Sequence, residues 1–289
     1  RSHGPADLMV SIRKEELPSL KGGFVTSLLT IVSVSSGSSV GLFGPIIHFG
    51  GCIAAALERF FKLLSRGVIL AAGGAAGIAA LFSAPIAACI FAHEMLLRRF
   101  RSSESAPVVM AALGGYFGAV MVLGDDRRFL SVMGDPPPLD PTSLSLAILV
   151  GISSGLLSSL YIYLIGAGPV WAKSTKIHPI LRPLVPATVL FLISPFFPQL
   201  IGPGMVSVNM ALAGEFTFYL LIVLAFLKVF ATAFCRSFGF HGGILLPAVF
   251  FGAMLGSAFD VLVGNGGHLY AILGAAACTG SAIGAPIAA

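Results

Sequence analysis

The stretch Gly41–Gly51, GLFGPIIHFGG, places glycines and one proline between two apolar runs of the chain. Proline fits the first turn of a helix, where its missing N–H is no loss. The residue before a proline is also pushed away from helical geometry. We therefore expect a helix to begin at Gly44-Pro45, inside apolar sequence. The alternative is that Pro45 only kinks a longer helix.

The composition around this stretch is that of a membrane protein. Of the 289 residues, 56% are hydrophobic and 10% are charged, and the mean hydropathy is +0.97. Soluble domains are about half apolar and about a quarter charged. The apolar runs lack the alternation of barrel strands. We expect an all-α, multi-pass integral protein of the plasma membrane, or of the inner membrane in a prokaryote.

Apolar segments with few charges are the candidate membrane helices. They are expected at about 24–40, 45–57, 67–92, 106–123, 143–171, 184–213, 217–235, 243–264 and 269–289. Several are shorter than the roughly 20 residues of a simple span. We therefore expect tilted and broken helices as well as simple spans.

The charges and cysteines exclude several classes of protein. The net charge of +5 comes from short basic clusters between apolar runs, such as Arg98, Arg99 and Arg101. Such clusters are typical of cytoplasmic loops and do not indicate a nucleic-acid partner. The four cysteines are scattered, so neither a disulfide nor a zinc site is implied. We expect no cofactor and no metal.

Two enzyme signatures are incomplete, and we do not expect an enzyme. His93-Glu94 lacks the second histidine four residues on that a zinc protease needs. The Ser35–Ser39 run, SSGSS, has hydroxyls but no histidine base that the sequence places beside it.

An internal repeat links the two halves of the chain. When Pro45 is placed on Pro247, PIIHFGGCIAAAL lies over PAVFFGAMLGSAF, and later GGAAGIAALFSAPIAA lies over GAAACTGSAIGAPIAA. Two matches at nearly one offset favour a duplication. We expect a single transmembrane domain over 1–289, with repeat one at about 2–100, connecting helices at about 101–195 and repeat two at about 196–289.

Two repeat-related helix starts inside a membrane predict an anion site. The first N–H groups of a helix have no partner within that helix. In the membrane they must face protein or a wet cavity. Free amides and the positive end of the helix dipole suit an anion. Broken helices in two repeats are typical of transporters and channels.

These motifs resemble the CLC family of chloride channels and transporters. GLFGPIIHFGG is similar to the family signature GREGP…GG, and Gly243–Pro247, GILLP, is similar to its GxFxP signature. The family also has a segment in which an Ala-Pro pair is followed by an acidic residue directly before a methionine. It is similar to the stretch AGGAAGIAALFSAPIAACIFAHEM of this chain. The N-terminal RSHGP stands where the family has GSGIP and keeps only Ser2 and Pro5. The resemblance implies a CLC-like inverted-repeat bundle, here without its first and last helices.

The resemblance also implies roles for particular residues. The Ser2 hydroxyl and the amides of Ile244 and Leu245 would bind a central chloride or similar anion. The backbone around Gly41, Phe43 and Gly44 would form an outer site. Glu94 matches the glutamate that carries protons in exchangers of the family. The family tyrosine of the central site would lie beyond the last residue, and the assembly would be a homodimer with one pore per subunit.

Phe43 stands where exchangers of the family have a glutamate. Phenylalanine cannot carry a proton or mimic a bound anion. We expect passive or weakly coupled chloride transport that is uncoupled from protons, with Phe43 as a hydrophobic gate. The alternatives are a chloride/proton antiporter with another proton path, perhaps through His48, and a non-conducting regulatory membrane relative.

Other polar residues in apolar surroundings have two interpretations each. Glu94 either transfers protons or pairs with Arg98 four residues on. His48 is expected to pack, and His241 is a candidate for a vestibule. Lys228 and Arg236 either raise the positive potential near the pathway or extend their charges to the membrane surface; the second is slightly favoured.

Overall fold

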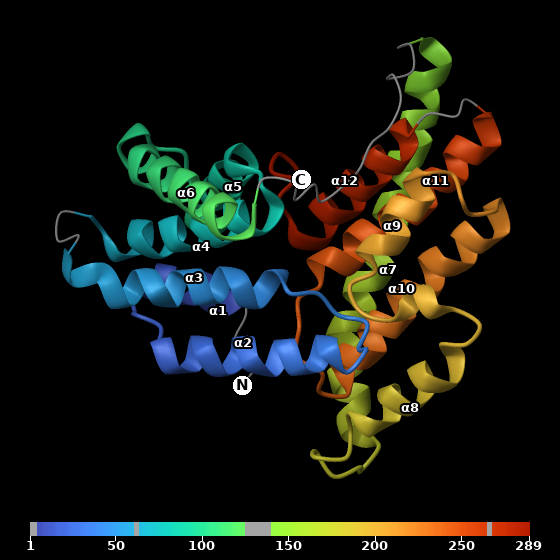
Figure 1. The fold of residues 1–289 in the computed structure, drawn as a ribbon, viewed down its shortest axis with the longest axis horizontal. Helices are drawn as coiled ribbons and strands as arrows, with labels where there is room; N and C mark the ends of the chain where they lie inside the picture. Colours follow the sequence, from blue (N-terminus) through green and yellow to red (C-terminus); the bar gives the residue numbers. More distant parts are fainter. Residues whose placement is uncertain (1–4, 61–63, 125–139, 265–267) are drawn as a thin grey trace. The chain divides into compact units, whose positions relative to one another are not determined.

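The computed structural model describes residues 5–60, 64–124, 140–264 and 268–289. The chain forms two compact units. The first comprises Arg1–Ile31, Leu42–Phe129 and Ile287–Ala289, and the second comprises Val32–Gly41 and Leu130–Pro286. Each unit is a set of packed helices (Figure 1).

The first unit is organised around α4 (Arg66–Phe82), which packs against α3 and α6. Its other elements are α1 (Pro5–Lys14), most of α2 (Leu20–Ser35), α3 (Phe43–Leu57), η1 (Glu58–Phe60), α5 (Pro85–Phe91), η2 (Ala92–Leu97) and α6 (Ser102–Leu123). The expected single segment 67–92 is two helices, because Ser83 turns to φ 54° just before Pro85. Helix α1 was not among the expected segments, since its mean hydropathy is low.

The second unit is built around α11 (Leu245–Val263), which packs against α7, α9, α10 and α12. All its residues from Leu245 to Ala258 are buried. The remaining elements are α7 (Pro141–Ser174), α8 (Leu184–Ile193), η3 (Pro198–Leu200), α9 (Met205–Leu212), α10 (Phe218–Ser237) and α12 (Leu269–Ile283). The expected segment 184–213 is divided into α8, η3 and α9, because prolines and glycines between 195 and 204 interrupt it.

Four helices are long and apolar enough to cross a membrane: α6, α7, α10 and α11. Helix α7 has 34 residues, which at about 1.5 Å per residue is longer than the roughly 30 Å hydrocarbon layer. Such a helix fits a bilayer by tilting. No strand is formed by the residues that the structure describes. The protein is a multi-pass, all-α membrane protein, as predicted.

Matching glycines pack the corresponding helix pairs of the two units. A Cβ on Gly50 of α3 would collide with the carbonyl of Gly73 on α4. A Cβ on Gly252 of α11 would collide with the carbonyl of Gly274 on α12. Small residues allow such close backbone approach between membrane helices. The sequence alignment pairs Gly50 with Gly252, so aligned positions make the same contact.

Candidate functional site

Both predicted helix starts are present. Helix α3 begins at Phe43 and α11 begins at Leu245, so Pro45 and Pro247 are each the third residue of their helix. Both prolines lie in first turns, where no N–H is needed. The alternative that they only kink longer helices is wrong.

Each helix start carries three N–H groups without a hydrogen-bond partner among the described residues. In α3 they belong to Leu42, Phe43 and Gly44, and the next donor, Ile46, already bonds the Leu42 carbonyl at 3.2 Å. Neither helix has a side-chain cap. Free N–H groups at a helix start form a ready anion site.

The start of α11 repeats this arrangement. Its free N–H groups belong to Ile244, Leu245 and Leu246, and Ala248 is the next donor, to the Ile244 carbonyl at 3.3 Å. The predicted anion-binding amides therefore have the free donors that this role requires.

A two-residue bridge fixes the chain just before both helices. The Gly41 N–H donates to the Gly243 carbonyl at 2.9 Å, and the Gly243 N–H donates to the Gly41 carbonyl at 2.5 Å. This antiparallel bridge lies within the second unit. Each helix begins two residues after its bridge glycine. The N–H and the carbonyl of Gly41, a predicted anion-binding residue, are thus both engaged in the bridge.

Phe43 lies in an aromatic cluster of the first unit. Its ring centroid is 5.4 Å from that of Phe82, at the end of α4, and 5.7 Å from that of Phe91, at the end of α5. Only 4% of Phe43 is exposed. The side chain is therefore held by packing, and no titratable group of the described chain forms part of this cluster.

Tyr161 of α7 positions the start of α11, and the sequence analysis missed it. Its hydroxyl donates to the Ile244 carbonyl at 2.9 Å, and its ring packs edge-on against Phe251 at 4.9 Å. Buried tyrosines usually find a partner for the hydroxyl. Nothing in the sequence around Tyr161 indicates which distant carbonyl that partner is.

Glu94 binds backbone amides. It lies in η2, a turn of π-helix, and its carboxylate accepts the N–H groups of Ile287 at 3.1 Å and Ala288 at 2.9 Å. The considered pair with Arg98 is not formed, because the π-turn and the left-handed Arg98 (φ 55°) replace regular i,i+4 geometry. The carboxylate thus ties η2 to the turn at Ile287 and Ala288.

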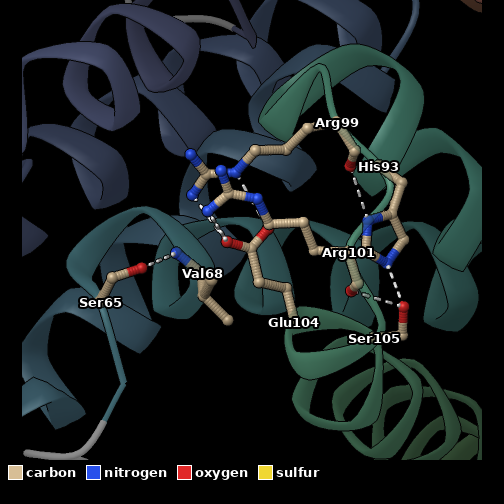
Figure 2. A network of polar contacts seen from close by, with 7 residues as sticks. All are labelled: Ser65, Val68, His93, Arg99, Arg101, Glu104 and Ser105. Carbon is tan, nitrogen blue, oxygen red and sulfur yellow. Dashed lines mark hydrogen bonds and ion pairs between the residues drawn. The ribbon is translucent and has the colours of Figure 1, made fainter.

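The segment after Glu94 is held by a polar network (Figure 2). The His93 ring lies 3.0 Å from the Arg99 carbonyl through Nδ1 and 3.1 Å from the Ser105 hydroxyl through Nε2. Arg99 pairs with Glu104 at 2.7 Å. These contacts join the turn to the first residues of α6.

Lys228 is fully buried within the second unit. Its ammonium donates to the carbonyls of Leu200 at 3.1 Å and Gly202 at 2.7 Å, and it lies 4.7 Å from the centre of the Phe250 ring. The favoured expectation that Lys228 extends to the membrane surface is wrong. Its amine instead bonds two carbonyls of the loop before α9.

The other candidates have less specific surroundings. Arg236 has a buried Nε with no partner among the described residues. The His241 N–H donates to the Ser33 hydroxyl at 3.1 Å. His48 is buried, with its Nδ1 3.6 Å from the Cys52 sulfur. Ser2 lies outside the described residues. No group of three potential metal ligands occurs in the described ranges.

Comparisons with known proteins agree with this architecture. The family model described as voltage gated chloride channel matches residues 1–289. An uncharacterized protein of Methanocaldococcus jannaschii is 27% identical over 92% of this chain and 67% of its own length. The voltage-gated ClC-type chloride channel ClcB of Escherichia coli is 25% identical over 91% of this chain and 63% of its own.

A solved structure has the same fold. The crystal structure of a CLC-type fluoride/proton antiporter is similar with a TM-score of 0.83 and 24% sequence identity, over 97% of this chain and 72% of that one. The chain thus spans slightly less than two thirds of the ClcB channel and somewhat more of the antiporter. The match of the family model covers every residue. The chain belongs to the voltage gated chloride channel family.

Proposed function

We propose that this protein transports chloride or a similar small anion across the membrane, using the helix starts at Phe43 and Leu245 to bind it. The observation that carries the proposal is the set of three free N–H groups at each start. Partial charges of a helix start stabilise a nearby anion by about 0.3–2 kcal/mol. The named function of the ClcB channel supports the same class of substrate.

Backbone donors suit fast passage of the ion. The two segments 41–45 and 243–247 contain no lysine and no arginine. A binding site must attract the ion yet release it, and a full charge in direct contact would hold it too firmly. Dipoles at helix starts meet both needs. Tyr161 and the bridge glycines keep the donors of α11 in place.

We further propose that transport is uncoupled from protons. Phe43 has no titratable group, and the cluster with Phe82 and Phe91 holds its ring as a hydrophobic gate. Glu94, the remaining candidate for proton transfer, has its Oε1 engaged by the Ile287 N–H and its Oε2 engaged by the Ala288 N–H. A structural acid fits these contacts better than a mobile proton carrier.

A proton-coupled antiporter is the second candidate function. It is favoured by one observation, that the similar solved structure is that of a fluoride/proton antiporter. In that case a path other than Phe43 would carry the proton. A non-conducting regulatory relative is the third candidate, since the same aromatic cluster could close the pathway altogether.

The deciding experiment is anion flux from proteoliposomes with opposed chloride and pH gradients. We expect chloride efflux without proton movement. Proton transport driven uphill by chloride would establish the antiporter, and absence of any flux would establish the non-conducting relative. Chloride, nitrate and fluoride are compared to define the anion preference.

Substitution of Phe43 tests the gate. Phe43→Ala and Phe43→Leu should both increase flux. Removing a buried phenylalanine ring costs about 3–5 kcal/mol, so the smaller change to leucine guards against loss of the fold. An unchanged or lower rate in folded Phe43→Leu protein would contradict the gate.

We propose the assembly and domain organisation that the family resemblance implies. The protein would be a homodimer with one pathway in each subunit. Residues 1–289 would form one transmembrane domain, with repeats at about 2–100 and 196–289 joined by connecting helices at about 101–195. Light scattering of the purified protein in detergent measures the number of subunits.

A further inference from the structure

Two of the free N–H groups at the start of α11 belong to peptides whose carbonyls are held from outside the helix. In a trans peptide the carbonyl and the N–H of the next residue point in opposite directions. The carbonyls opposite the N–H groups of Ile244 and Leu245 are those of Gly243 and Ile244, and both accept a hydrogen bond. Such a bond fixes the direction of the N–H and increases its polarity.

The Ile244–Leu245 peptide is held by a side chain. The Tyr161 hydroxyl donates to the Ile244 carbonyl at 2.9 Å, which is shorter than the 3.3 Å bond that this carbonyl accepts from the Ala248 N–H. Because hydrogen bonds in a chain polarise one another, the bond from Tyr161 makes the Leu245 N–H a stronger donor. The Leu245 N–H is one of the proposed anion donors, so the anion receives this gain.

The preceding peptide is held in the same way by the backbone. The Gly41 N–H donates at 2.9 Å to the Gly243 carbonyl, which belongs to the peptide that carries the Ile244 N–H. Two successive N–H groups therefore point away from carbonyls that are already bonded. The segment 243–247 contains no lysine and no arginine, so polarised peptides supply the positive potential within this segment.

Packing fixes the position of the Tyr161 hydroxyl. Tyr161 and Phe251 are both fully buried, and their rings pack edge-on with their centroids 4.9 Å apart. In such surroundings of low dielectric constant a hydrogen bond is electrostatically stronger than in water. Tyr161→Phe keeps the ring and its packing, so it removes only the hydroxyl that polarises the Ile244–Leu245 peptide.

We propose that Tyr161 is a positioning residue that raises the affinity of the α11 start for anions and favours a small anion, such as chloride, over a larger one, such as iodide. A small anion comes closer to the N–H groups, so it gains more from each increase in their polarity. This role of Tyr161 rests on the proposed function, since both concern the same anion site. It makes a side chain of α7, outside the helix that binds the anion, a determinant of anion preference.

Nuclear magnetic resonance of the purified protein in detergent tests the role of Tyr161 at the peptide itself. When isoleucine is labelled at its carbonyl carbon and leucine at its nitrogen, signals arise only from leucines that follow an isoleucine, which occur at five places in the chain. Ile244→Val removes the Leu245 signal and so identifies it. We expect chloride to shift this signal. Tyr161→Phe should move the signal in the absence of chloride and weaken the chloride affinity about threefold, because polarisation strengthens a hydrogen bond to a charged group by about 10–30%.

The outcomes separate the role of Tyr161 from the proposed function. If chloride leaves the Leu245 signal unchanged in the unaltered protein, the anion site is overturned, and the role of Tyr161 with it. If chloride shifts the signal with equal affinity in the unaltered protein and in Tyr161→Phe, the anion site stands and only the role of Tyr161 is overturned.

Calorimetric titration with chloride and with iodide tests the anion preference. Tyr161→Phe should weaken the binding of chloride about threefold and that of iodide by less than about twofold. Tyr163→Phe, at an exposed tyrosine of the same helix, is the matched control and should change neither affinity. Unfolding midpoints without added anion verify that both variants are folded. Equal losses of affinity for the two anions would overturn the preference.

Discussion

Gly41 and Gly243 hold each other by two backbone hydrogen bonds, at positions that match in the two copies of the repeat. The pairing fixes the chain two residues before α3 and two residues before α11. A side chain at Gly41 would bring its Cβ to 2.9 Å from the Cβ of Leu246, closer than packed atoms allow. The glycine is therefore required by close packing at the bridge.

Gly41→Ala should destabilise the protein and reduce anion flux. Forcing one extra carbon into a packed site costs about 1–3 kcal/mol, and the displaced bridge would move the free amides. Thermal unfolding in detergent measures the first effect and proteoliposome flux the second. Gly151→Ala, in α7, is the control, because an added Cβ there meets no atom within 4 Å. Equal unfolding midpoints for the two variants would refute the packing argument.

The duplicated helix pairs make a second, symmetrical prediction. Gly50→Ala and Gly252→Ala should both lower the unfolding midpoint, because each new Cβ would collide with a backbone carbonyl that cannot turn aside. Gly118→Ala, in α6, adds its Cβ to open space and should be neutral or slightly stabilising. A large effect at Gly50 with none at Gly252 would show that the two pairs are not equivalent.

Local signals in the sequence predicted much of this structure. The two helix starts could be located because proline is favoured in the first turn of a helix, so Pro45 and Pro247 each mark a start in the local sequence. The bridge between Gly41 and Gly243 could not be predicted, because its two hydrogen bonds join backbone groups and involve no side chain that would indicate the pairing. The bond from Tyr161 to the Ile244 carbonyl was missed for a related reason: the partner lies 83 residues away.

Buried cations show a different limit of sequence reasoning. Lysine next to apolar residues usually places its charge at the membrane surface, and this expectation failed for Lys228. What keeps the amine inside is a pair of carbonyls at Leu200 and Gly202, which the η3 turn and the following glycines leave without helical partners. Hydropathy cannot report unpaired backbone groups of another segment.

Lys228→Met should therefore destabilise the second unit. Methionine fills similar space but leaves the two carbonyls unpaired, and each buried unsatisfied group costs about 1–3 kcal/mol. Thermal unfolding detects the change. Lys173→Met, at an exposed position of α7, should shift stability by no more than about 0.5 kcal/mol. If both variants unfold at the same temperature, water has replaced the amine and the loop does not depend on Lys228.

The start of α7 should respond to acid. Hydrogen bonds from the Ser143 side chain and from the Ser143 N–H, the latter at 2.7 Å, hold the pKa of Asp140 below its usual value. Because the folded pKa is depressed, the stabilisation is present above the unfolded pKa of about 3.9 and is lost as the pH falls through the folded pKa. Unfolding midpoints of Asp140→Asn should approach those of the unaltered protein as the pH is lowered. A constant difference at every pH would show that ionisation of Asp140 has no part.

Glu94→Gln separates the two transport mechanisms. Glutamine keeps one carbonyl oxygen for the amides of Ile287 and Ala288 and loses the titratable group, so the local structure is retained. In an uncoupled transporter the anion flux of Glu94→Gln should equal that of the unaltered protein, and neither protein should move protons. Glu16→Gln, at an exposed position of the first unit, controls for loss of a negative charge. In a proton-coupled antiporter the unaltered protein would move protons against their gradient, and Glu94→Gln alone would abolish that movement. Parallel recordings of chloride and pH with the three proteins therefore decide whether Glu94 carries protons or only holds the chain at Ile287.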